Sequence, residues 1–177
     1  FRSRICYAIF PLLVAVMGNI PRDIQDERII RDLLRRMSVD EKVGQLELLS
    51  RPWGDDFNGE SPEWADTMER IRAGKLGALF NGQGVHINRE LQRVAVEESR
   101  LGVPLIFGAD VWHGMWTVFP APLAEAASWD PDLAYQTARA SAVETTASGL
   151  MWTFSPMVDT ARDQRWGRNI EGAGEDP

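Results

Sequence analysis

Residues 149–177 read GLMWTFSPMVDTARDQRWGRNIEGAGEDP, and this stretch predicts a strand followed by a polar loop. Residues 150–154 have the aliphatic and aromatic bulk of a buried strand. Pro156 ends the strand because it has no N–H to donate. The charged residues of the loop are Arg162, Asp163, Arg165, Arg168, Glu171, Glu175 and Asp176, with Trp166 among them. We expect an ordered, internally salt-bridged loop at a strand end, which is where parallel α/β proteins bind ligands.

The composition narrows the class of protein. The chain has 177 residues, enough for one domain core but short for a whole α/β barrel of ~250 residues. Its formal net charge of −7 argues against nucleic acid as a partner. A single cysteine excludes an internal disulfide, and two histidines without a CxxC pair argue against a metal site. Because no glycine-rich phosphate loop follows a strand, we expect no cofactor.

Residues 1–20 are typical of a secretory signal. Arg2 and Arg4 precede an apolar run over residues 5–17, and small or polar residues follow it. The run is shorter than the ~20 residues of a membrane span. Cys6 lies inside the run, so neither a lipid anchor nor a stable membrane anchor is expected. The alternative is a buried first helix or strand. We therefore expect an exported protein, periplasmic or secreted.

The next segments predict helices. Residues 22–37 form an amphipathic helix. Ser38 then opens a new helix, because Ser38 and Glu41 have the spacing of a capping box. Its expected buried face consists of Val43, Leu46 and Leu49. Residues 51–61 are loop-like, and residues 62–73 form a further helix.

Strands and helices then alternate. We expect strands at 76–80, 103–107 and 150–154, separated by helices at 85–100 and 130–149. This order predicts an α/β fold with a parallel sheet. The small residues Ala134, Ala138 and Ala142 should let the last helix sit close on that sheet. The pattern fits either the first part of a barrel or an open doubly wound sheet.

Asp110 and His113 follow the second expected strand in FGADVWHG. A carboxylate at a strand end is well placed to accept hydrogen bonds from ligand hydroxyls, but it could equally cap a helix or pair with an arginine. His113 could be a ligand group or an acid/base. A structural role that ties down the loop is favoured.

The arginines after the third strand, Arg162, Arg165 and Arg168, offer planar donor groups that suit vicinal hydroxyls. The alternative is that all three pair with neighbouring carboxylates. Tryptophans are also frequent here, and sugar rings stack on indole faces. We expect Trp152 in the core, and Trp112 and Trp116 are the better candidates for an exposed ligand wall.

These segments resemble glycoside hydrolase family 3. RDQRWGRNIEGAGEDP at residues 162–177 is similar to the family signature RDPRWGR-x-x-E-x-x-GEDP. The similarity continues through FGADVWHG at 107–114 and TVFPAPLAEAASWDPDL at 117–133, and it covers residues 38–177. The departures are Gln164 for proline, Ala173 for an aromatic residue and Ser155 for alanine.

The resemblance implies the N-terminal portion of a (β/α)8 TIM-type barrel, spanning residues 21–177 and preceded by helices. It implies a retaining hydrolase that uses an aspartate nucleophile and a separate acid/base. By similarity, Asp110 and Arg168 bind the sugar at the cleavage subsite. The residues expected to shape the pocket are His113, Arg162, Asp163, Arg165, Trp166 and Glu171.

The DVWHG segment favours a β-glucosidase-like enzyme that releases terminal β-linked glucose from oligosaccharides or glucosides. A β-xylosidase or an enzyme acting on longer β-glucans is the alternative within the family. The nucleophile and acid/base are expected further downstream, so we expect this chain to be an inactive fragment of a longer protein. Outside this activity, the pattern also fits a non-catalytic sugar-binding protein or an unrelated α/β-barrel lyase or isomerase.

Overall fold

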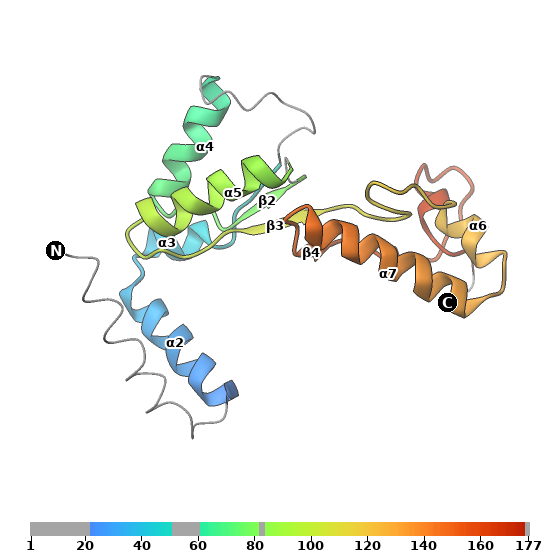
Figure 1. Ribbon diagram of the computed structural model, residues 1–177, viewed down its shortest axis with the longest axis horizontal. Coiled ribbons are helices and arrows are strands. Elements are labelled where there is room, and N and C mark those ends of the chain that lie inside the picture. The colour runs from blue at the N-terminus through green and yellow to red at the C-terminus, as the bar shows by residue number, and fades with distance from the viewer. Residues whose placement is uncertain (1–21, 51–60, 82–83, 176–177) are drawn as a thin grey trace.

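Short parallel strands form the centre of the fold. The computed structural model describes residues 22–50, 61–81 and 84–175 (Figure 1). The strands are β1 (Leu48–Ser50), β2 (Ala78–Phe80), β3 (Ile106–Ala109) and β4 (Trp152–Thr153). They form one four-stranded parallel sheet in the order β1-β2-β3-β4. A doubly wound sheet reverses its strand order at a switch point, whereas a (β/α) barrel keeps chain order, so the fold is the N-terminal portion of a barrel.

Helices connect successive strands. They are α2 (Arg22–Arg36), α3 (Val39–Gly44), α4 (Pro62–Arg72), α5 (Val85–Arg93), α6 (Pro122–Ala126) and α7 (Pro131–Ala147), with a π-helix η1 (Val94–Glu98) and a 3₁₀ helix η2 (Asn169–Glu171). Figure 1 shows α4 and α5 beside the sheet, α2 projecting from it, and α6 and α7 extending away at the end that carries β4. Every crossover therefore contains a helix, as parallel strands require.

The expected helix starts at Ser38 and Asp130 are confirmed. Ser38 Oγ accepts a hydrogen bond from the Glu41 N–H at 3.2 Å, and Glu41 Oε2 accepts one from the Ser38 N–H at 2.8 Å. This is a complete capping box. At the start of α7, Asp130 Oδ1 accepts bonds from the N–H groups of Asp132 and Leu133. Both caps satisfy first-turn N–H groups that have no acceptor within the helix.

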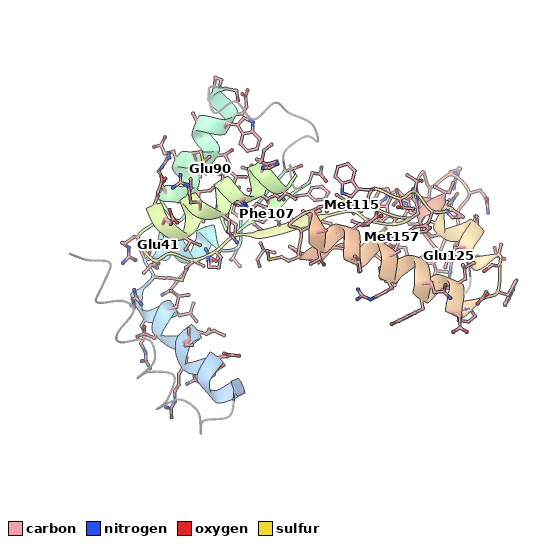
Figure 2. All side chains as sticks on the ribbon, viewed as in Figure 1. Glu41, Glu90, Phe107, Met115, Glu125 and Met157 are labelled. Atoms are coloured by element: carbon pink, nitrogen blue, oxygen red, sulfur yellow. The ribbon has the colours of Figure 1, made fainter. Side chains whose placement is uncertain are left out.

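The apolar core lies between the sheet and α4, α5 and η1. Its largest members, Trp64, Phe107 and Ile71, are each 2% exposed. Figure 2 shows Phe107 within this half of the molecule. The cluster as a whole consists of Trp64, Ile71, Leu76, Leu79, Leu91, Val94, Ala95, Leu105, Phe107, Ala109, Val111 and Leu150. Burial of these side chains is the main stabilising contribution in this half of the chain.

The expected buried face of the helix after Ser38 is wrong. The helix ends at Gly44, Val43 and Leu46 are exposed, and Leu49 is half-buried on β1. The face turned inward carries Gly44 instead, because it packs on backbone: a Cβ there would lie 2.3 Å from the Gly74 carbonyl oxygen. A larger residue could not make this contact.

The expected strand at 103–107 begins later, at Ile106. Pro104 has no N–H for a ladder. The Gln92 side chain of α5 forms hydrogen bonds with both backbone groups of Leu105. Its Oε1 accepts from the Leu105 N–H at 2.7 Å, and its Nε2 donates to the Leu105 carbonyl at 3.1 Å. The expected helix at 85–100 is divided into α5 and the π-helix η1.

Two expectations, one for Trp152 on β4 and one for the alanines of α7, are wrong. Trp152 is 43% exposed instead of lying in the core, because β4 is the edge strand of the described sheet and the Trp152 ring packs edge-on against Phe154. On α7, Ala138 and Ala142 are exposed, and Ala134 is only half-buried. These alanines line a cavity rather than packing on the sheet, because α7 runs away from it (Figure 1).

Some predictions lie outside the described residues. They are the secretory signal at 1–20 with Cys6, most of the loop at 51–61, and the end of the C-terminal motif at 176–177. Within the described ranges, no helix has the length and apolar character needed to cross a membrane.

Candidate functional site

The candidate site begins where β3 ends. Asp110 follows Ala109 directly and is half-buried. The indole N–H of Trp112 donates to Asp110 Oδ1 at 3.2 Å. A carboxylate offers about four acceptor positions, so this bond orients the group and leaves it able to accept from ligand hydroxyls.

Arg168 lies over the ring of Trp112, the residue that donates a hydrogen bond to Asp110. Its guanidinium carbon lies 5.4 Å from the Trp112 ring centroid, within the range of a cation–π contact. Arg168 Nε donates to Glu171 Oε2 at 2.5 Å, and Nη2 lies 3.7 Å from Met157 Sδ. Figure 2 shows Met157 in the elongated half of the molecule that carries α7.

Asp110 and Arg168 therefore share one support, the Trp112 indole. Among contacts with described residues, two of the five N–H donors of the Arg168 guanidinium are occupied, by Glu171 and Met157, which leaves three. The arrangement combines a carboxylate acceptor, a fixed cationic donor group and an aromatic ring at the carboxyl ends of β3 and β4. Groups of this kind recognise a polyhydroxylated ligand.

His113 closes the loop that follows Trp112. Its Nδ1 lies 3.0 Å from the Phe119 carbonyl oxygen, and the Phe119 N–H donates to the His113 carbonyl at 2.7 Å. The imidazole is thus engaged by loop backbone. This contact is of the kind that a structural histidine makes.

The remaining predicted residues lie in the loop after β4. Asp163 and Arg165 form an ion pair at 2.6 Å. The Arg165 side chain and then its backbone N–H hold the pKa of Asp163 below its ordinary value. Trp166 is half-buried, with its backbone N–H on the Asp163 carbonyl. In the described part of the chain Arg162 is exposed and has no side-chain hydrogen bond. The salt-bridged loop is therefore confirmed for the pairs Asp163–Arg165 and Arg168–Glu171.

Three residues that support the site carry no local signature in the sequence. Ser155 Oγ donates to the Val111 carbonyl at 2.5 Å, between Asp110 and Trp112. On α7, Glu144 accepts bonds from the loop after β3, and Ser148 Oγ, at the C-cap of α7, accepts from the Trp116 indole N–H at 2.8 Å. None of the three stands in a local pattern that marks such long-range contacts.

A cavity of about 600 Å³ lies between α7 and the loops of the site. Trp112, His113 and Glu171 contribute to its wall, whereas Asp110 and Arg168 do not. Ala173 also lines it. The cavity thus adjoins the candidate site from the α7 side. Among the described residues no group of three or more His, Cys, Asp or Glu side chains is placed to hold a metal ion.

The strands follow barrel order, and a carboxylate, an arginine and an indole lie at their carboxyl ends. These features define an α/β-barrel protein with a site for a polar ligand. Residues 38–177 match the family model described as "Glycosyl hydrolase family 3 N terminal domain". This chain belongs to glycosyl hydrolase family 3.

Curated relatives agree with the family. The chain is 43% identical over 162 residues to the periplasmic beta-glucosidase of Salmonella typhimurium, covering 91% of this chain and 20% of that protein. It is 30% identical over 168 residues to the periplasmic beta-glucosidase/beta-xylosidase of Dickeya chrysanthemi, covering 82% of this chain and 25% of that protein. The chain thus spans about a fifth to a quarter of these relatives.

Solved structures show the same fold. A beta-glucosidase from Listeria innocua, a D270A mutant in complex with laminaribiose, superposes with a TM-score of 0.74 at 38% identity. That match covers 85% of this chain and 21% of the other. The same enzyme in complex with glucose has a TM-score of 0.73 at 36% identity, covering 85% of this chain and 22% of the other.

Proposed function

We propose that the protein to which this chain belongs is a retaining glycoside hydrolase that releases terminal β-linked glucose from oligosaccharides or glucosides. The observation that carries the proposal is the joint support of Asp110 and Arg168 by Trp112 at the carboxyl ends of β3 and β4. The names of the relatives, which are beta-glucosidases, support the sugar.

In this proposal the described segment holds the sugar. Asp110 accepts hydrogen bonds from ring hydroxyls, and the free N–H groups of Arg168 donate to the same sugar. Glu171 keeps the guanidinium in place, since its carboxylate is only 14% exposed and bonds Arg168 Nε. His113, Asp163, Arg165, Arg162 and Trp166 shape the surrounding loops.

The bond-breaking groups belong to other parts of the proposed enzyme. A retaining mechanism needs a nucleophilic carboxylate and an acid/base about 5–5.5 Å apart. We assign neither role to a residue of this chain. The protein is proposed to be exported, with residues 1–20 as the signal; the relatives named periplasmic support this.

The test is the activity of the full-length protein on aryl β-glucosides, with the anomer of the first product followed by NMR. We expect hydrolysis with retention. Asp110→Ala and Arg168→Ala should each lower kcat/KM at least ~100-fold, about 2.7 kcal/mol, because both remove hydrogen bonds that tighten at the transition state. Near-parental kinetics in either variant would refute its assignment.

A β-xylosidase is the second candidate, supported by the Dickeya chrysanthemi relative, whose name includes that activity. Parallel assays on aryl β-glucoside and aryl β-xyloside decide between the two by their kcat/KM ratio. Binding of glucose without hydrolysis of either substrate would favour a non-catalytic sugar-binding protein.

A further inference from the structure

We propose that Glu144 of α7 is a positioning residue for the sugar site: it holds the loop after β3 so that Asp110, Trp112 and His113 keep their places. This inference rests on the proposed function. Glu144 lies 34 positions after Asp110 in the chain, on the helix that leads to β4.

The contacts of Glu144 form a specific acceptor site for the loop. Its Oε2 accepts bonds from the backbone N–H groups of Trp116 and Thr117, both at 2.8 Å, and its Oε1 accepts from Thr117 Oγ1 at 2.6 Å. The Thr117 hydroxyl and then the two backbone N–H groups hold the pKa of Glu144 below its ordinary value. One side chain thus satisfies three donors of a loop that has no regular secondary structure.

A second contact joins the same loop to the same helix. The Trp116 indole N–H donates to Ser148 Oγ at 2.8 Å, one helical turn after Glu144. The Trp116 ring is otherwise 71% exposed, so this hydrogen bond and not burial fixes it in the described structure. The loop tip is therefore attached to α7 mainly through polar groups.

The attachment is transmitted to the sugar site by a tight turn. Gly114 has φ 112°, and a Cβ on it would lie 1.8 Å from the Thr117 carbonyl oxygen. His113 and Phe119 close the base of the same loop through two contacts. A shift of Thr117 therefore moves Gly114 and His113, which directly follow Trp112, the shared support of Asp110 and Arg168.

For holding the loop, the length of the Glu144 side chain matters more than its charge. Glutamine has the same length, and its carbonyl oxygen can accept both backbone N–H groups while the Thr117 hydroxyl turns to accept from the amide. Aspartate keeps the charge but is one methylene shorter. Glu144→Gln should therefore retain the loop position, and Glu144→Asp should lose it.

The experiment uses the full-length protein with three variants, Glu144→Ala, Glu144→Asp and Glu144→Gln. Arg139→Ala, an exposed change on the same helix, is the matched control. Two quantities are measured: kcat and KM on an aryl β-glucoside, and amide hydrogen exchange of the peptide that contains Trp116 and Thr117. A misplacement of ~1 Å can cost ~100-fold in rate, and we expect about a tenfold loss of kcat/KM in the Ala and Asp variants.

We expect the Ala and Asp variants to exchange the Trp116 and Thr117 amides faster, and the Gln and Arg139 variants to stay within about threefold of the parent in kcat/KM. If Glu144→Ala does not fold, Glu144→Asp decides. Faster exchange with unchanged kinetics, unchanged exchange, or a Gln variant as impaired as the Ala variant would each overturn the proposal. An inactive parent enzyme would instead overturn the proposed function, and this inference with it.

Discussion

The two halves of the molecule are held together by different interactions. From α3 to β3 the chain is organised around a buried apolar cluster, whereas of the described residues beyond Val111 only Leu150 belongs to that cluster. The second half relies on hydrogen bonds between the loop after β3 and α7 and on ion pairs within the loop after β4, and it exposes Trp116 and Trp129. Figure 2 shows the two halves, with Glu41 and Glu90 in one and Glu125 at the far end of the other, while Met115 lies between them.

The two halves contribute differently to stability and to ligand binding. The first half presents strand ends from a packed scaffold, which gives precise positions. The second half carries most of the polar groups of the candidate site, and its contacts can be removed one at a time. Substitutions in the first half should therefore change stability, and substitutions in the second half should change binding.

A pair of tryptophans, one in each half, should show the strongest contrast. Trp64 is 2% exposed and Trp129 is 92% exposed. In the 177-residue chain, Trp64→Ala should lower the free energy of unfolding by about 3–5 kcal/mol, and Trp129→Ala should change it by less than ~0.5 kcal/mol. Chemical denaturation measures both. Equal losses would show that the second half has an apolar core of its own.

The next effect concerns the stacking of Arg168 on Trp112. Arg168→Lys keeps the charge but removes the planar group that bonds Glu171 and covers the indole. In the full-length enzyme kcat/KM should fall about tenfold, or ~1.4 kcal/mol, with little change in melting temperature. A large drop in melting temperature would mean that this loop contributes to folding as the first half does.

A smaller effect distinguishes two helix caps of the first half. Ser38→Ala breaks a capping box and should cost about 1 kcal/mol. Ser61 accepts a single longer bond from the Trp64 N–H, at 3.4 Å, so Ser61→Ala should cost less. Thermal or chemical unfolding of the two variants gives the comparison. A larger loss at Ser61 would contradict the role assigned to the box.

The last effect is confined to acid pH. The Arg100 side chain, together with the Ser38 N–H, lowers the pKa of Glu41 from 4.5 to about 2. Since the folded pKa is depressed, the stabilisation is present above 4.5 and is lost as the pH falls toward about 2. The free energies of unfolding of the parent and of Arg100→Ala should therefore differ at neutral pH and converge over this window. A constant difference down to pH 2 would show that Arg100 acts through packing alone.

The parts of the fold that could be predicted from the sequence are those that local interactions determine. Local signals are reliable: the caps at Ser38 and Asp130 depend on spacing within one turn. The barrel order of the strands cannot be read in this way, because strand order depends on which segments pair. The strand β1 (Leu48–Ser50) is not predicted either, because Val43, Leu46 and Leu49 have the spacing of a continuing helix face.

The site is only partly accessible from the sequence. Asp110 and Arg168 stand in motifs, but nothing local indicates that both contact Trp112, since residues 112 and 168 meet only in the folded chain. Glu144 lies among small residues of α7, and its role depends on a loop 27 and 28 positions away. Trp152 is 43% exposed although its bulk favours a core, and β4 is the last strand of the described sheet.

Asp110 and Arg168 are proposed to act on one sugar through a shared support. A double-mutant cycle of Asp110→Ala and Arg168→Ala on kcat/KM of the full-length enzyme tests this most directly. We predict non-additive losses, with a coupling of about 1 kcal/mol or more. Strictly additive losses would show that the two residues serve separate sites and would contradict the shared support.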